Sequence, residues 1–223
     1  LYREEHARMR AQQQPVGTPD PDYPTLTVVR DDGSRAPLNI AHIRTIVHEA
    51  CTGLSGVSEK AILDEAMRNL YDGVAEKDVN TALVITARTL VESEPNYTYV
   101  TSRLLLDKLR AEALSFFGVA DTATQADMEA LYPTTLPLYV KKGVELDLLS
   151  PELLTFDLEK LGKALIAERD LQFTYLGLQT LYDRYFIHSN DVRIELPQIF
   201  FMRVAMGLAI EEADKEARAI EFY

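Results

Sequence analysis

The feature that most constrains this chain is a series of apolar residues spaced three or four positions apart and interrupted by glycines and prolines. A period of about 3.6 residues is typical of amphipathic helices, which bury one face. The residues that share a face in successive helices are Ile40, Ile43, Val47 and Cys51; Ile62, Ala66 and Leu70; Val79, Leu83, Ala87 and Leu90; and Leu106, Leu109, Ala113 and Phe116. The sequence therefore predicts four packed helices in its first half.

A short β-hairpin is predicted directly before these helices. The β-branched run at 26–30 is followed by the turn sequence Asp31-Asp32-Gly33-Ser34 and by a return through residues 36–38. Ser58 has the position and chemistry of a cap for the second helix. The hairpin and the four helices together predict one domain at residues 25–118.

Two segments precede the hairpin. Residues 1–13 suit a helix, whereas residues 14–24 contain four prolines and a glycine and are typical of an extended linker. The chain begins with neither methionine nor a signal sequence, and its last residues still follow a helical pattern. We therefore expect it to be part of a longer protein.

The second half, residues 121–223, is predicted to be mostly helical. The expected helices are 124–131, 136–142, 157–167, 170–186, 197–212 and 214 onward. Pro197 suits the first residue of its helix, and residues 189–191 suit a turn between short strands at 186–188 and 192–194. The predicted fold class is mainly α.

Composition excludes several classes of function. The 223 residues include 35 acidic and 23 basic side chains, a net charge of −12 that disfavours binding to nucleic-acid phosphates. No apolar stretch reaches the roughly 20 residues that span a membrane. The single cysteine, Cys51, excludes an internal disulfide and a cysteine-rich metal site. We expect a cytoplasmic protein that binds neither nucleic acid nor membrane.

Neither a catalytic site nor a metal site is predicted. The four histidines are scattered without the spacing of metal ligands. Cys51 lies on the apolar face of its predicted helix, so we expect a buried and unreactive thiol. Nucleophile motifs and glycine-rich phosphate loops do not occur in the sequence.

The most specific signal is an anion site where the hairpin meets the first helix. Arg30 ends the first predicted strand, and Asn39 and His42 open the helix. Backbone N–H groups and the helix dipole both favour an anion at a helix start. These residues therefore predict a phosphate site.

The same residues resemble the ATP-cone family. Its usual signature is a strand ending in Lys-Arg-Asp-Gly, then Asn or Asp, then a Lys-Ile pair on the first helix. This chain has Arg30-Asp31-Asp32-Gly33, Asn39 and His42-Ile43. Later segments resemble the cone and the helical region before the barrel in class I ribonucleotide reductase large subunits; they are residues 71–74, 96–104, 168–175 and 181–185.

The resemblance covers about residues 25–223, and it implies what the longer protein does. Such enzymes reduce ribonucleoside diphosphates to deoxyribonucleotides for DNA replication by a radical mechanism. They use three cysteines in the barrel, a small radical-bearing subunit and a second large subunit. A cone binds ATP as activator or dATP as inhibitor. Residues 1–13 resemble the last helix of another cone, so this cone would be the second of two.

The cone departs from the family's pattern at four positions. Asp31 stands where a second basic residue is expected, and His42 stands where the helix lysine is expected. Glu76 replaces a threonine, and Ala111 replaces a basic residue. Triphosphates are bound by charge-assisted hydrogen bonds, so these changes predict that ATP and dATP bind weakly or not at all.

Two functions remain open. One is a nucleotide sensor in which Arg30, Asn39, His42 and Arg110 hold a triphosphate. The other is a structural spacer or subunit-interaction module that keeps the cone fold without binding nucleotide. A cone-bearing transcriptional repressor would need four zinc-binding cysteines and is excluded. Class III reductases also begin with a cone, but the helical segments argue against them.

Overall fold

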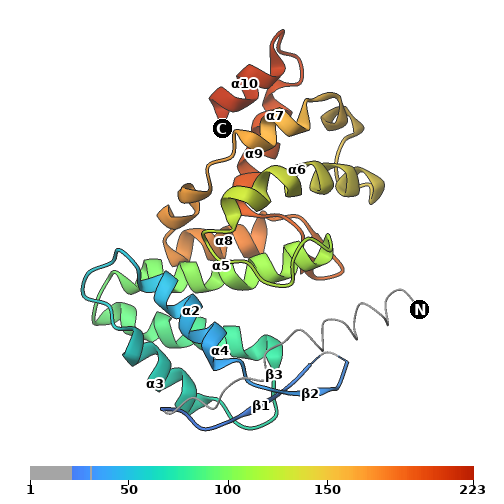
Figure 1. Cartoon of the computed structure of the whole chain (residues 1–223). Coiled ribbons are helices and arrows are strands. Elements are labelled where there is room, and N and C mark those ends of the chain that lie inside the picture. Colours follow the sequence, from blue (N-terminus) through green and yellow to red (C-terminus); the bar gives the residue numbers. More distant parts are fainter. Residues whose placement is uncertain (1–21, 31) are drawn as a thin grey trace.

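The computed structural model describes residues 22–30 and 32–223. The expected helix at 1–13 and all of the linker before residue 22 lie outside the described residues. Within them, a small sheet and helices α2 to α5 form one end of the molecule, and α6 to α10 form the other (Figure 1). The mainly α prediction is confirmed.

The predicted hairpin is confirmed as two antiparallel strands, β1 at Thr27–Val29 and β2 at Arg35–Pro37. Gly33 in the connecting turn has a φ of 79°, a conformation that strains residues with a Cβ atom. A third strand, β3 at Val74–Ala75, pairs in parallel with β1 and was not predicted. Two residues are too few to show a strand period.

The four predicted helices are also confirmed. They are α2 at Ile40–Cys51, α3 at Glu59–Asn69, α4 at Glu76–Thr89, extended by the 3-10 turn η1 at Leu90–Glu92, and α5 at Tyr97–Phe116. The Ser58 side chain accepts a hydrogen bond from the backbone N–H of Ala61 at 3.2 Å, so it is the expected cap of α3.

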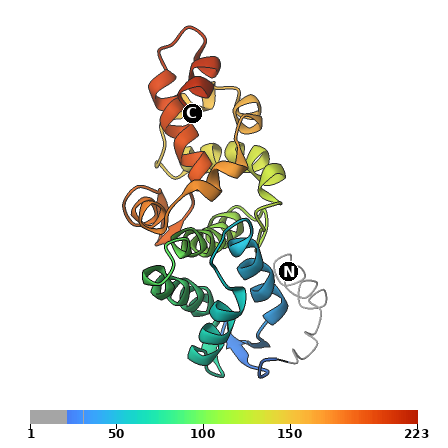
Figure 2. The ribbon, with the colours of Figure 1, turned by 90° about the vertical axis from the view of Figure 1, so that its left-hand side faces the viewer.

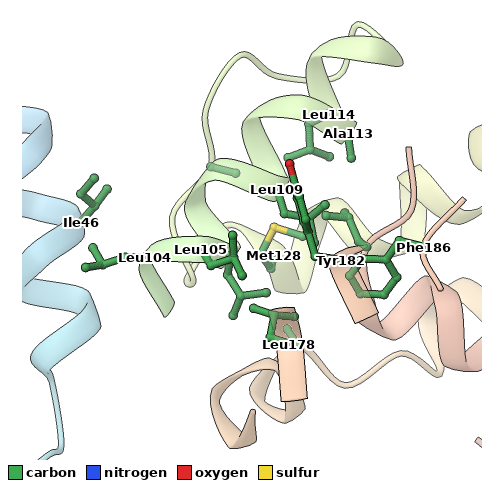
Figure 3. Close-up of a cluster of buried hydrophobic side chains, with 14 of the residues drawn as sticks. Ile46, Leu104, Leu105, Leu109, Ala113, Leu114, Met128, Leu178, Tyr182 and Phe186 are labelled. Atoms are coloured by element: carbon green, nitrogen blue, oxygen red, sulfur yellow. The ribbon is translucent and has the colours of Figure 1, made fainter. Parts of the chain in front are cut away.

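Helix α5 lies between the two ends of the molecule in both views (Figure 1, Figure 2). It packs against α2 and α4 on one side and against α8 and β5 on the other. Leu104 points toward Ile46 of α2, while Leu109 lies with Met128 and Leu178 (Figure 3). The limits 25–118 and 121–223 stay a prediction, and α5 contributes to the core of both parts.

The second half is mostly helical, as predicted. Its elements are α6 at Met128–Glu145, η2 at Pro151–Thr155, α7 at Leu158–Lys163, η3 at Ala167–Gln172, α8 at Tyr175–Arg184, β4 at His188–Ser189, β5 at Val192–Arg193, α9 at Pro197–Ala209 and α10 at Lys215–Phe222. The strands β4 and β5 form the expected hairpin, and Pro197 is the first residue of α9.

The prediction of separate helices at 124–131 and 136–142 was wrong. One continuous helix, α6, includes the end of the first predicted helix and all of the second. Pro133 and Pro137 stand inside it. Each proline removes a backbone hydrogen bond and normally ends a helix. The helix continues through both prolines because the side chains on its inner face are buried in the core; they are Tyr132, Leu136, Tyr139 and Val140.

The helices predicted at 157–167 and 170–186 are each shorter in the structure. Helix α7 ends at Lys163, and α8 begins only at Tyr175. Between them η3 turns Asp170 into the interior, and the Thr174 hydroxyl accepts from the backbone N–H of Gly177 to cap α8. The tertiary position of Asp170, rather than the apolar period, therefore sets this boundary.

Candidate functional site

The predicted anion site lies where the β1–β2 hairpin meets the starts of α2 and α4. Arg30 Nε is 3.7 Å from Oε2 of Glu76, the first residue of α4. Glu76 is also the residue that stands where the cone pattern has threonine. The hairpin arginine that was predicted to bind phosphate therefore has a carboxylate beside it.

Asn39 has a structural partner at the start of α2. Its side-chain oxygen accepts a hydrogen bond from the backbone N–H of His42 at 3.0 Å, which makes it the N-cap. A capping side chain satisfies one of the free donors of a helix start. The backbone donors available to an anion there are reduced by one.

His42 is close enough to act electrostatically on a buried carboxylate of α5. Asp107 is 7% exposed, and its side chain accepts a hydrogen bond from the Asn80 amide of α4 at 3.1 Å. Burial raises the pKa of Asp107, while the charges of His42 and Arg110 act in the opposite direction. A second acidic group thus lies within the cone, close to two of the predicted nucleotide contacts.

Arg110 is turned toward the second half of the chain. It is 4% exposed, and its Nη2 donates to Asp170 Oδ2 at 3.3 Å and also to the side-chain oxygen of Gln125. Asp170 lies 60 residues further along the chain. The structure therefore places Arg30 beside Glu76 at the start of α4 and Asn39 and His42 at the start of α2, and it engages the Arg110 guanidinium in an ion pair between the two halves.

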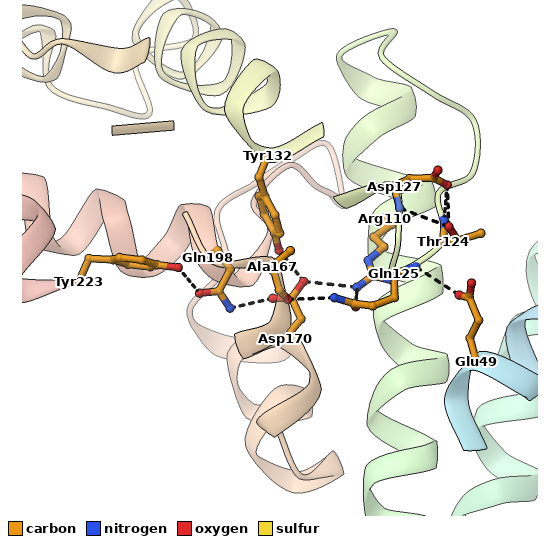
Figure 4. Close-up of polar contacts among 10 residues, drawn as sticks. All are labelled: Glu49, Arg110, Thr124, Gln125, Asp127, Tyr132, Ala167, Asp170, Gln198 and Tyr223. Atoms are coloured by element: carbon orange, nitrogen blue, oxygen red, sulfur yellow. Dashed lines mark hydrogen bonds and ion pairs between the residues drawn. The ribbon is translucent and has the colours of Figure 1, made fainter. Parts of the chain in front are cut away.

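Asp170 is the centre of a buried polar network (Figure 4). Besides Arg110, it accepts from the Tyr132 hydroxyl of α6 at 2.7 Å and from the Gln198 amide of α9 at 2.7 Å. Gln198 in turn accepts from the Tyr223 hydroxyl at 2.7 Å. Burial raises the pKa of Asp170, and its three donors favour the ionised form. The network ties α5, η3, α6, α9 and the end of α10 together.

Gln125 extends this network to the first helix of the cone. Its amide donates to the Ala167 carbonyl at 2.9 Å, and its backbone N–H donates to Glu49 of α2 at 3.2 Å. Residues from α2, α5 and η3 are therefore connected through one side chain and one backbone group. The junction between the two halves is polar as well as apolar.

Two family models match this chain. Residues 26–112 match the ATP cone domain, and residues 171–223 match the all-alpha domain of ribonucleotide reductase. The chain is therefore similar to ribonucleotide reductase large subunits, through a cone domain and through part of their all-alpha domain. All four predicted nucleotide contacts lie inside the cone match, whereas Gln125 and Asp170 lie between the two matches.

The relatives are named as reductase subunits. The chain is 39% identical to the ribonucleoside-diphosphate reductase subunit alpha of Chlamydia muridarum, over all of this chain and 21% of that protein. It is 33% identical to the subunit alpha of Helicobacter pylori strain 26695 over 89% of this chain and 24% of that protein. The large subunit of Danio rerio is 26% identical over 89% of this chain. The chain thus spans about a fifth to a quarter of these relatives.

The other candidate groups are the single cysteine and possible metal ligands. Cys51 is buried, and burial raises the pKa of its thiol to about 11, so the reactive thiolate is disfavoured at neutral pH. Among the described residues, no three His, Cys, Asp or Glu side chains are grouped as metal ligands. The helices of the described part are also too short or too polar to cross a membrane.

Sequence reasoning missed the buried polar residues. The signal for Asp107 was present, since a carboxylate interrupts the apolar face between Leu106 and Leu109. Asp170 and Gln198 gave no such signal, because their partners lie 25 or more residues away. The role of Asp170 and Gln198 is visible only in the fold, where η3 packs against both α5 and α9.

Proposed function

We propose that this segment is the regulatory and structural N-terminal part of a ribonucleoside-diphosphate reductase large subunit, and that its own ATP cone is degenerate. In this proposal the longer protein makes deoxyribonucleotides together with a small radical subunit and a second large subunit. The cone at 26–112 binds ATP or dATP weakly or not at all. It acts as a rigid connector to the all-alpha domain.

This proposal rests on the partners of the two arginines that were predicted to contact phosphate. Arg30 lies beside the carboxylate of Glu76, and the guanidinium of Arg110 is engaged by Asp170 and Gln125. Both cations would have to exchange these partners for phosphate oxygens. The buried carboxylate of Asp107 adds unfavourable charge near the same space.

An apolar face on α9 supports a place within a larger protein. Phe201, Val204 and Leu208 lie one turn apart and are 40%, 40% and 67% exposed. Phe173 stacks on Phe201 with ring centroids 6.2 Å apart and extends this face. A contiguous exposed apolar surface usually marks a contact region. Because the relatives are four to five times longer, we propose that another part of the large subunit covers this face.

Calorimetric titration with ATP and dATP tests the degenerate cone. At fixed magnesium and low salt, where a weak electrostatic site is least screened, we expect no binding or millimolar affinity. The reason is that Asp31, His42, Glu76 and Ala111 replace favourable groups. Micromolar binding of either nucleotide by the unaltered chain would contradict this proposal.

A restoration series separates loss of charge from loss of shape. The variant Asp31→Arg, His42→Lys, Glu76→Thr returns three positions to the cone pattern and removes the carboxylate beside Arg30. If charge alone prevents binding, this variant gains affinity for ATP. The matched control Arg68→Lys changes an exposed side chain of α3 and should leave binding unchanged.

We expect the purified chain to form no deoxyribonucleotides with any small subunit and reductant. Ribonucleotide reduction in this family requires several cysteines, whereas this chain has Cys51 alone. A product assay by chromatography checks this expectation, and detectable product would overturn it.

Cys51→Ala should lower the free energy of unfolding by about 1 kcal/mol, because a buried group is removed.

A further inference from the structure

A small cavity lies at the junction between the cone and the all-alpha helices. Its volume is about 20 Å³, and it is bounded by α2, α5, Gln125 and Leu171. The polar side chains on its wall are Glu49, Arg103, Asp107, Arg110 and Gln125. One water molecule needs about 10–15 Å³ of such space and two to four polar partners. The cavity therefore meets both requirements for a single water.

Two arginines on this wall each have one N–H donor without an acceptor. The Nε atoms of Arg103 and Arg110 are buried and have no hydrogen-bond partner among the described residues. Their terminal nitrogens are used elsewhere, by the carbonyls of Ala50 and Thr52 in one case and by Gln125 and Asp170 in the other. A buried donor without an acceptor costs free energy, so native structures almost always supply one.

We propose that this cavity binds one structural water molecule, which accepts a hydrogen bond from Arg110 Nε and donates one to the carboxylate of Asp107. Asp107 Oδ2 accepts from Asn80, and each carboxylate oxygen can accept more than one hydrogen bond. Arg103 and Glu49 offer a further donor and acceptor on the same wall. The water links the buried carboxylate of the cone to the arginine that pairs with Asp170.

Charge balance favours water over an ion. Two arginines and two carboxylates line the cavity, so neither an anion nor a cation meets a wall of opposite net charge. The water site shares Arg110 with the predicted nucleotide contacts, but it needs none of the residues of the hairpin.

A high-resolution crystal structure of the chain tests the proposal directly, with crystals grown in sodium bromide. The expected result is one isolated density peak within about 3.2 Å of Arg110 Nε and of an Asp107 oxygen, without anomalous signal. An anomalous bromide peak in the cavity would overturn the proposal in favour of an anion site. A cavity without density would overturn it as well.

A pair of variants at Ala50 tests it in solution. Ala50 lies on the cavity wall inside α2, and serine and valine have similar helix propensities. Valine would displace the water without providing an acceptor, whereas the serine hydroxyl can accept in its place. We expect Ala50→Val to melt about 4 °C or more below Ala50→Ser. If the cavity is dry, valine fills it favourably and melts at the same temperature or higher, which contradicts the proposal.

Discussion

Replacing Arg110 by alanine is expected to lower the free energy of unfolding by about 3–5 kcal/mol, a cost typical of breaking a buried ion pair from one side. Asp170 is fully buried and would keep only the Tyr132 and Gln198 donors. Burial already disfavours the charged form of its carboxyl group. The loss would therefore come mainly from an uncompensated buried carboxylate rather than from a missing attraction.

Urea unfolding followed by circular dichroism measures this loss, and two further variants identify its cause. In Arg110→Ala/Asp170→Asn the unpaired charge is removed, so the double variant should be more stable than the sum of the two single effects implies. Arg68→Ala removes an arginine from an exposed pair with Glu65 and should cost less than about 1 kcal/mol. A similarly small effect of Arg110→Ala would contradict a buried, energetically important pair.

Gly162→Ala is expected to destabilise the protein by about 1–3 kcal/mol, the usual cost of overpacking. A Cβ atom at Gly162 would lie 2.8 Å from the backbone oxygen of Pro133 and 3.0 Å from its Cα atom. Backbone atoms cannot rotate away as a flexible side chain can, so α7 and α6 would have to move apart. The substitution would disturb the contact between these two helices.

Gly207→Ala in α9 provides the matched control. An added Cβ there has no neighbouring atom within 4 Å among the described residues. Alanine is a better helix former than glycine by about 0.8–1.0 kcal/mol, so this variant should be slightly more stable than the parent. Thermal melting of both variants should give shifts of opposite sign. Equal shifts would show that helix propensity, rather than the close approach of Pro133, decides the outcome at Gly162.

The first half of the fold was predictable because its signals are local. The helical period of α2 to α5, the Ser58 cap and the turn at Gly33 each depend on residues within a few positions of one another. Strand β3 is the exception. It pairs with β1 across more than 40 residues of chain, and its two residues carry no pattern of their own.

Helix α6 shows where local signals fail. Pro133 and Pro137 each favour a break, and sequence reasoning therefore placed two helices there. In the structure Tyr132, Leu136 and Tyr139 are completely or almost completely buried along one face. Burying a large side chain is worth about 1.5–3 kcal/mol, so several such contacts outweigh the lost hydrogen bonds.

For the candidate site, the sequence by itself determined the chemistry that is present. The residue identities carried the resemblance to the ATP cone, and they showed the retention of Arg30, Asn39 and Arg110 and the acidic replacement at Glu76, because residue identity does not depend on packing. Only the tertiary structure decided how those groups are used. Arg110 pairs with Asp170 because α5 and η3 meet in the interior, where a charge must find its partner or destabilise the fold. That partner lies 60 residues away, a separation at which the sequence carries no local period.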